Sequence, residues 1–257
     1  MSDFSVIIPA RYQSSRFPGK PLALLAGRPM IEHVYRQACA SGAARVIVAT
    51  DDERIADCCR GFGAPVAITR ADHASGTDRL AEVVAAEGLP SREIVVNLQG
   101  DEPLMPPELI RQAARALADH PQADMATLAS ALVRREEIFD PNIVKLVRDH
   151  HGYAMYFSRA PIPWDRDGFA AGNDAPLRAG YLRHWGIYAY RGDFLYRYPS
   201  MAAVDLETVE CLEQLRALWH GARIYVGIAE SALPPGVDTP QDLERAANYL
   251  AATANGG

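Results

Sequence analysis

Three cations on one loop near the start of the chain form the first candidate site. The segment SVIIPARYQSSRFPGKPL, residues 5–22, begins as an apolar strand and then carries Arg11, Arg16 and Lys20 among prolines and a glycine. A solvated loop needs polar residues, but it does not need every charge to have one sign. A triphosphate presents several anionic oxygens and needs cations where charge builds on its leaving group. We therefore expect this loop to bind a triphosphate.

Two further observations bear on this loop. Any one of the cations alone would be interpreted as ordinary surface charge, and their joint position on a loop stiffened by proline favours a ligand instead. Lys20 and Lys145 are the two lysines among 26 basic residues, and a lysine ammonium is a compact point charge suited to a phosphate oxygen. Pro21 follows Gly19-Lys20, so the Walker A spacing is absent and a P-loop of that kind is excluded.

Two aspartates are candidate metal ligands. Asp101 follows a glycine in NLQGDEPLMPP, and Asp238 lies in GVDTPQDL. A triphosphate needs Mg²⁺, which typically takes one or two carboxylates together with substrate oxygens. The alternative is that Asp101 forms a turn and that Asp238 merely adjoins a helix cap at Thr239-Pro240.

The elements that must position these residues alternate in the first half of the chain. Short strands are expected at 5–9, 45–50, 65–69 and 93–98, and helices at 29–41, 52–60 and 76–87, the last with Ser75 and Asp78 at capping-box spacing. Apolar strands alternating with helices predict a parallel sheet covered on both faces. Ligands bind beyond the carboxyl ends of such strands. The cationic loop, Asp51-Asp52, residues 70–79 and Asp101 each follow one of these strands.

The second half of the chain has a different pattern. Longer strands are expected at 125–133, 142–148, 153–158, 183–190 and 223–229, with a hairpin turn at His151-Gly152. Helices are expected at 205–220 and 240–251, and a mobile loop rich in glycine and alanine at 168–180. The fold class is therefore α/β, with a mostly parallel central sheet and a smaller antiparallel part.

Composition excludes several classes of protein. The chain has 257 residues, of which 49% are hydrophobic and 23% charged, as expected for a substantial core. No apolar run approaches the ~20 residues of a membrane span, and no signal peptide is indicated. The net charge of −6 disfavours nucleic acid as a partner. Four cysteines without zinc-ligand spacing predict reduced, mostly buried thiols in a cytoplasm.

Seven segments together resemble the 3-deoxy-manno-octulosonate cytidylyltransferases, also called CMP-KDO synthetases. They are VIIPARYQSSRFPGKPL, ADHASGTDRLAEV, VNLQGDEPLMPP, YFSRAPIPWDRD, LRHWGIYAYR, LEQLR and GVDTPQDLE, and the likeness extends over residues 4–250. The resemblance implies a nucleotide-diphospho-sugar transferase-like, Rossmann-like three-layer fold with one domain over 1–257. Within it, 1–120 would mainly bind CTP, 121–230 would bind KDO and form the dimer, and 231–257 would supply the metal-binding turn and C-terminal helix.

The resemblance also implies an activity and its residues. CMP would pass from CTP to KDO with Mg²⁺ as cofactor, in a cytoplasmic homodimer that activates KDO for lipopolysaccharide biosynthesis. Catalysis would depend on Arg16, Lys20, Asp101 and Asp238, the two aspartates as metal ligands. The residues placed beside CTP are Ala10, Arg11, Arg16, Lys20, Arg70, Ser75, Gly76, Thr77, Gln99 and Asp101. The residues placed beside KDO are Gln99, Arg159, His184, Tyr188 and Glu213.

Alternatives stay open for the acceptor residues and for the activity. The carboxylate of KDO calls for a cation with a bidentate face, which Arg159 offers, but Arg159 could also form a surface ion pair. His184 could be a packed core histidine, and Glu213 could pair with Arg216 three residues on. Rival functions are a cytidylyltransferase for another acceptor and a nucleotide sensor without catalysis. No residue stands out as a general base.

Overall fold

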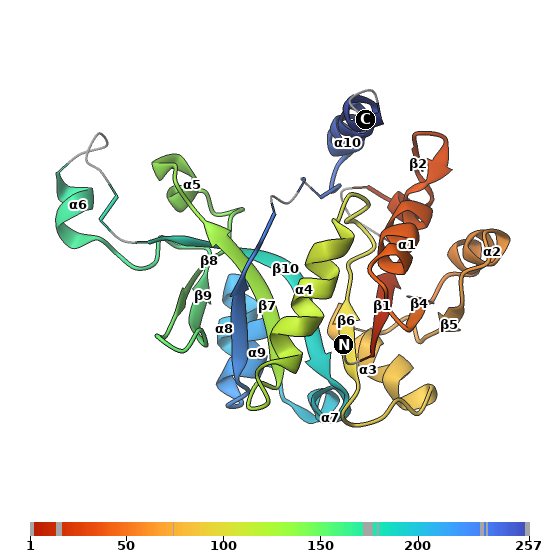
Figure 1. Ribbon diagram of the computed structural model, residues 1–257, viewed down its shortest axis with the longest axis horizontal. Coiled ribbons are helices and arrows are strands. Elements are labelled where there is room, and N and C mark those ends of the chain that lie inside the picture. The colour runs from red at the N-terminus through yellow and green to blue at the C-terminus, as the bar shows by residue number, and fades with distance from the viewer. Residues whose placement is uncertain are drawn as a thin grey trace.

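A mixed sheet crosses the centre of the protein, with helices on both of its faces (Figure 1). The computed structural model describes residues 3–13, 17–73, 75–171, 177–178, 180–231, 234 and 236–254. In this part of the chain, nine strands form the sheet, seven of them in the order β11-β7-β10-β6-β1-β4-β5. Their bounds are β1 Phe4–Ala10, β4 Arg45–Thr50, β5 Val66–Ile68, β6 Ile94–Asn97, β7 Met125–Ala131, β8 Lys145–Arg148, β9 Ala154–Ser158, β10 Leu182–Arg191 and β11 Ile224–Ile228.

The sheet is mostly parallel, as the sequence predicted. β1 pairs in parallel with β4 and β6, β4 with β5, and β7 with β11. β10 is antiparallel to both β6 and β7, so it joins the two parallel sets. β8 pairs antiparallel with β9 and with β10, which confirms the smaller antiparallel part. A separate two-stranded ribbon joins β2 (Leu24–Leu25) to β3 (Arg28–Pro29).

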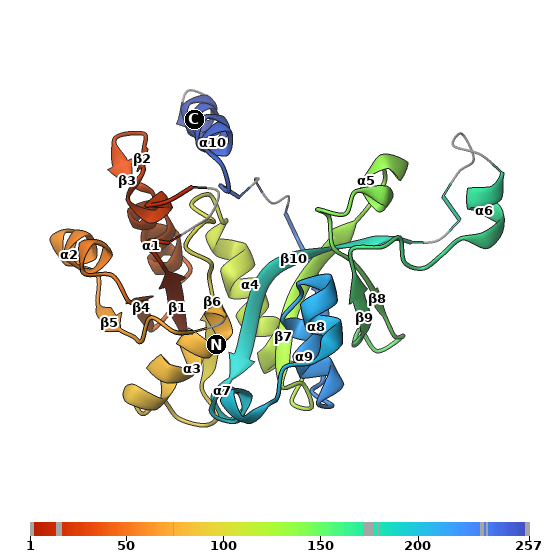
Figure 2. The ribbon, with the colours of Figure 1, turned by 180° about the vertical axis from the view of Figure 1, so that it is seen from behind.

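Alternate residues of β1 pack into two separate hydrophobic cores, one on each face of the sheet. Val6 and Ile8 pack in one cluster with apolar residues of three helices on that face, α1 (Met30–Ala40), α2 (Glu53–Gly61) and α4 (Pro107–Ala118). Ile7 points to the other face, where the cluster includes residues of α3 (Gly76–Ala86), α7 (Gly192–Arg197) and α9 (Gln214–Trp219). This period of two in a strand buried on both faces gives the three-layer architecture. Figure 2 shows the same layers from behind.

Four further helices and two short 3-10 turns complete the described secondary structure. They are α5 (Arg135–Phe139), α6 (Arg166–Ala170), α8 (Asp205–Glu210), α10 (Pro240–Ala254) and the short 3-10 turns η1 (Lys20–Leu22) and η2 (Tyr198–Ser200). In both views α6 stands away from the body of the molecule (Figures 1 and 2). α3 begins at the predicted cap, since the Asp78 N–H donates to Ser75 Oγ at 3.1 Å. α10 begins likewise, with the Asp242 N–H donating to Thr239 Oγ1 at 3.2 Å.

Two predictions about local structure are wrong. The single helix expected at 205–220 is two helices, because Cys211 adopts a left-handed conformation with φ of 51° and ends α8. Neither glycine nor proline marks this break in the sequence. The thiols are free, as predicted, but only Cys59 is buried, while Cys39 and Cys211 are exposed. α4 was not expected at all.

Three further expectations concern the loop at 168–180, membrane-spanning helices and the division of the chain. The predicted loop at 168–180 begins inside α6, and its residues 172–176 and 179 lie outside the described residues. None of the helices in the described ranges is both long and apolar enough to cross a membrane. The division of the chain at 120 and 230 stays a prediction.

Candidate active site

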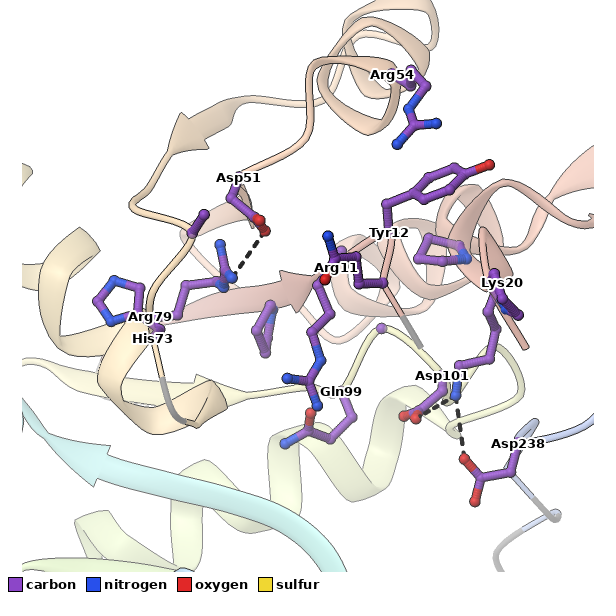
Figure 3. A pocket seen from close by; sticks show the side chains of 17 residues that line it. Arg11, Tyr12, Lys20, Asp51, Arg54, His73, Arg79, Gln99, Asp101 and Asp238 are labelled. Carbon is purple, nitrogen blue, oxygen red and sulfur yellow. Dashed lines mark hydrogen bonds and ion pairs between the residues drawn. The ribbon is translucent and has the colours of Figure 1, made fainter. Parts of the chain in front are cut away.

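A cavity of about 970 Å³ lies at the carboxyl ends of β1, β4 and β6. Among the residues that line it are Arg11, Lys20, Gln99, Asp101 and Asp238, which come from distant parts of the chain (Figure 3). The sequence predicted that the strand ends would bring the cationic loop and the segment with Gln99 and Asp101 to one edge of the sheet, and that Asp238 would join Asp101 there on one metal ion. That convergence is observed for every one of the five.

The cationic loop is closed at its base by a tyrosine. The Gly19 N–H donates to the Tyr12 carbonyl at 2.9 Å. Gly19 has φ of 71°, and a Cβ added there would lie 3.1 Å from the Tyr12 ring, so this position favours glycine. The Arg54 guanidinium lies 3.4 Å from the Tyr12 ring centre. Arg16 lies outside the described residues.

Lys20 joins the two aspartates predicted as metal ligands. Its ammonium donates to Asp101 Oδ2 at 2.8 Å, to Asp238 Oδ1 at 3.2 Å and to the Val237 carbonyl at 2.9 Å. Figure 3 shows the ammonium between the two carboxylates. The Val237 N–H also donates to the Asp101 carbonyl at 2.9 Å. Folding therefore brings together two aspartates that are 137 positions apart, as 238 minus 101 gives.

A glycine makes room for this convergence. A Cβ added at Gly100 would lie 2.9 Å from the Pro9 carbonyl oxygen, so only glycine lets the end of β6 pass this close to β1. Asp101 leaves the sheet directly after that contact. The glycine in the predicted motif is thus explained by close approach of two backbones.

The two carboxylates fit a magnesium ion. They approach one cationic atom, and Mg²⁺ uses one or two carboxylates together with phosphate oxygens and water. In the described ranges there is no group of three or more His, Cys, Asp or Glu side chains that could hold a metal without a substrate. The donor set therefore suits an ion that is shared with a bound nucleotide.

A third carboxylate, Glu102, was missed by the sequence analysis. Burial raises the pKa of Glu102 to about 8, and the negative charges of Asp101 and Asp238 act in the same direction. Its Oε1 would lie 2.9 Å from a Cβ added at Gly236, so it sits directly beneath the turn that carries Asp238. Its only signal in the sequence is its place next to Asp101.

The far end of the first cavity holds a buried ion pair. Arg79 is 4% exposed and lies 2.9 Å from Asp51 Oδ1, and it also donates to the Thr69 hydroxyl. His73 contacts Glu82 beside it. Asp51 and Arg79 both lie in stretches that the sequence analysis placed at strand ends, but their partnership could not be read from the sequence.

A second cavity, of about 830 Å³, adjoins the first. Four of the five side chains predicted beside KDO line it, namely Gln99, His184, Tyr188 and Glu213. Arg11 and Gln99 line both cavities, and Figure 3 shows Arg11 extending towards Gln99. The two cavities therefore meet at these two side chains.

Buried polar atoms in the second cavity lack protein partners. Within the described part of the chain, Tyr188 Oη, Glu213 Oε2 and Gln214 Nε2 have no hydrogen-bond partner. Burial raises the pKa of Tyr188 well above its usual value. Burial also raises the pKa of Glu213, against the opposing effect of the Ser75 and Thr77 hydroxyls. Because an unpaired buried polar group is costly, these atoms point to a ligand with several hydroxyl groups.

His184 is a neutral side chain in the wall of this cavity. Burial lowers the pKa of His184 to about 3. The Thr127 hydroxyl donates to the Ile187 carbonyl at 2.8 Å or the Trp185 carbonyl at 3.0 Å. Thr127 Oγ1 must then accept from His184 Nε2, which lies 3.0 Å away. Nδ1 is consequently the nitrogen without a proton.

Of the other described residues predicted beside CTP, three line a cavity and two do not. Ala10 lines the first cavity, and Ser75 and Gly76 line the second. Thr77 is buried against the Tyr190 hydroxyl at 3.2 Å, and Arg70 is exposed with its Nε on Asp72. Neither is among the described residues that line the two cavities.

The Arg159 guanidinium donates hydrogen bonds to backbone carbonyl groups. Its Nε donates to the Glu210 carbonyl at 2.7 Å, and its Nη1 donates to the Pro141 carbonyl at 2.9 Å. It is not among the described residues that line the second cavity. Its predicted role beside KDO stays a prediction.

Arg216 pairs with a different glutamate from the one the helical spacing suggested. Its guanidinium binds both carboxylate oxygens of Glu207, at 2.7 and 2.5 Å. Glu213 instead occupies the position before α9, makes no side-chain hydrogen bond to that helix, and lines the cavity. The break at Cys211 separates α8 from α9, and this lets Glu207 fold back onto Arg216.

Comparison with known proteins gives a consistent result over nearly the whole chain. A family profile described as Cytidylyltransferase matches residues 5–224. A 3-deoxy-manno-octulosonate cytidylyltransferase from Alkalilimnicola ehrlichii is 60% identical over 96% of both chains. One from Vibrio vulnificus is 55% identical over 97% of this chain and 98% of its own.

Solved structures agree with these relatives. A structure described as CMP:2-keto-3-deoxy-manno-octonic acid synthetase complexed with CTP is 42% identical, with a TM-score of 0.89 over 98% of this chain and 100% of its own. A nucleotidyl transferase from Methanothermobacter thermautotroptrophicus is 17% identical, with a TM-score of 0.61 over 98% and 100% of the two chains. At that identity the likeness is one of fold alone.

Proposed function

The chain belongs to the cytidylyltransferase family, and from this premise we propose that it transfers CMP from CTP to KDO, releasing pyrophosphate and activating KDO for lipopolysaccharide biosynthesis. The relatives that carry this activity in their names match the chain almost from end to end. The enzyme class is therefore that of a nucleotidyltransferase.

The observation that carries the proposal is the meeting of two unlike cavities at Arg11 and Gln99. The first is lined by cations and carboxylates, as a nucleotide triphosphate and its metal ion require. The second contains unpartnered hydroxyl, carboxylate and amide atoms, as a sugar requires. A group transfer needs both substrates held side by side with the reacting atoms at the junction.

We assign roles to the chain's own residues on this basis. Arg11, which lines both cavities, would hold the α-phosphate at their junction, where the 2-hydroxyl of KDO would attack in line. Lys20 would stabilise charge on the departing pyrophosphate, and Arg16, which is outside the described residues, stays a prediction for the same role. Asp101 and Asp238 would hold Mg²⁺, which when bound neutralises phosphate oxygens and lowers the pKa of a coordinated hydroxyl.

The acceptor side binds by hydrogen bonds. Tyr188, Glu213 and Gln214 offer buried polar atoms to the hydroxyl groups of KDO, and the unprotonated His184 Nδ1 can only accept. Neither His184 nor Glu213 is among the described residues that line the first cavity, so the proposal assigns no general base. A cytoplasmic location and a homodimer belong to the proposal as well, and the free thiols support the former.

An acceptor comparison tests this function. The purified chain is given CTP and Mg²⁺ with KDO, N-acetylneuraminate or methylerythritol phosphate, and pyrophosphate release is measured. We expect release with KDO and little with the other two. Turnover with another acceptor would assign the enzyme to that substrate, and CTP binding without release from any acceptor would favour a nucleotide sensor.

A further inference from the structure

Lys145 is a fully buried lysine whose ammonium binds three backbone carbonyl groups. Its exposed fraction is 0%. Its Nζ donates to the carbonyls of Asp140 at 2.8 Å, Ile143 at 2.6 Å and Arg159 at 2.5 Å. An ammonium has three N–H donors and a neutral amine has two, so this set of acceptors is matched by the charged form. Burial lowers the pKa of Lys145, which means that the charge is costly to keep there.

One of the carbonyls that Lys145 binds, that of Ile143, belongs to a residue in the wall of the second cavity. Residues 142–144 line that cavity, and Lys145 binds the chain on both sides of Asn142, at Asp140 and Ile143. The next carbonyl, that of Val144, accepts from the His184 N–H at 2.8 Å. The wall segment 140–144 is therefore joined to the strand that carries His184.

The third carbonyl ties the wall segment to the end of β9. Lys145 reaches the Arg159 carbonyl, and Arg159 in turn donates to the Pro141 carbonyl at 2.9 Å. Carbonyls of three residues in the segment, Asp140, Pro141 and Ile143, are thus held by two side-chain cations. The segment has no helix or strand of its own. Its local bonds are a turn at Asp140, where the Asn142 N–H donates to Oδ1 at 2.8 Å and the Ile143 N–H to the carbonyl at 3.2 Å, so the two cations fasten this turn to the neighbouring strand ends.

We propose that Lys145 is a positioning residue for the acceptor, fixing the wall segment 140–144 and so the shape of the second cavity. The proposal rests on the proposed function, because it takes the second cavity as the KDO site. Lys145 touches neither cavity itself, so its effect passes through the segment. It should therefore act on KDO binding and leave CTP binding unchanged.

The variants follow from the geometry of the ammonium. Lys145→Met keeps the length of the side chain but removes the ammonium donor from all three carbonyls, of which, in the described part of the chain, only that of Asp140 keeps another donor, the Ile143 N–H at 3.2 Å. Lys145→Arg keeps the charge, but a planar guanidinium cannot direct three donors towards acceptors arranged around one point. Arg148→Met is the matched control, since Arg148 lies on the same strand and donates to a carbonyl, that of Val226 at 2.9 Å, away from the cavity wall.

The test measures KM for KDO and for CTP separately by pyrophosphate release, with thermal unfolding of each full-length variant. We expect Lys145→Met and Lys145→Arg to raise the KM for KDO by about 10- to 100-fold, the range for a misplaced binding group, with the KM for CTP within about twofold. Arg148→Met should leave both constants near those of the wild type. If Lys145→Met does not fold, Lys145→Arg decides the question.

Two results would overturn the positioning role. One is an unchanged KM for KDO in a folded Lys145→Arg enzyme. The other is an equal rise in both KM values, which a general loss of structure would produce. A wild type that releases no pyrophosphate with KDO would instead contradict the proposed function, so the two failures are distinguishable.

Discussion

Replacing Tyr188 by phenylalanine should move stability and activity in opposite directions. Its side chain is 4% exposed and its hydroxyl has no hydrogen-bond partner within the described residues. A buried polar group left unpaired costs about 1–3 kcal/mol. Tyr188→Phe removes that group and keeps the ring that stacks on Tyr190. We therefore expect the free energy of unfolding to rise by about 1 kcal/mol, or roughly 2–4 °C in Tm for a chain of this length.

The same change should weaken use of the acceptor. If the partner of the hydroxyl is a KDO oxygen, the bond forms in a cavity that excludes bulk water and its loss costs about 1–2 kcal/mol. That corresponds to a fall of roughly 5- to 30-fold in kcat/KM for KDO. The KM for CTP should not change, because Tyr188 lines only the second cavity of the two.

Tyr198 provides the matched control. Its hydroxyl is likewise unpartnered in the described part of the chain, and its side chain is 2% exposed, but it lines neither cavity. Tyr198→Phe should give the same gain in stability without any change in the kinetics with KDO. Urea unfolding and steady-state pyrophosphate release measure both effects. A Tyr188→Phe enzyme that is less stable than the wild type, or a Tyr198→Phe enzyme equally impaired with KDO, would refute the reasoning.

Three further predictions concern the metal site, the leaving group and pH. Asp101→Asn and Asp238→Asn should each lower turnover by about 10²–10³, the double variant should be little worse than the worse single one, and EDTA should abolish wild-type activity; multiplicative losses would argue against a shared ion. Lys20→Arg should stay clearly impaired in pyrophosphate release although the charge is kept, and full activity would contradict the need for a point charge. Since the His184 pKa of about 3 lies below the unfolded value of 6.5, the unfolded chain binds more protons between these pH values and stability falls as the pH falls from 6.5. Between pH 8 and pH 5 this histidine should lower the unfolding free energy of the wild type by about 2 kcal/mol. His184→Asn lacks the titrating group, so its unfolding free energy should fall by about 2 kcal/mol less over the same range. An identical pH profile in the variant would contradict the buried, neutral state.

The sequence predicted the first cavity well because strand ends are local features. β1 and β4 end at Ala10 and Thr50, within one residue of the prediction. In a parallel sheet the segments that follow such strands must meet at one edge. Gly100, before Asp101, is also explained by the sheet edge, because the backbone there passes too close to β1 for any side chain. The sequence was sufficient to predict the position of a residue where hydrophobic periodicity and the order of strands determine that position.

Partners of side chains were harder to predict because they depend on packing across the whole chain. Arg216 binds Glu207 only because the backbone turns at Cys211, and no glycine or proline marks that turn. Glu102, whose pKa is raised by burial, lies against Gly236, which is 134 positions further on, as 236 minus 102 gives. Neither relation leaves a pattern of spacing in the sequence.

The structure explains why two of the basic residues are lysine in a chain that otherwise uses arginine. Both lysines of the chain have their ammonium groups on three acceptors, Lys20 on two carboxylates and a carbonyl, and Lys145 on three carbonyls. Three acceptors around one point match the three N–H groups of an ammonium and not the planar fork of arginine. One lysine serves the nucleotide cavity, and the other supports the wall of the acceptor cavity. In a chain whose other 24 basic residues are arginine, lysine is found where the geometry around the charge is compact, so the two Lys→Arg variants test one physical idea at two separate sites.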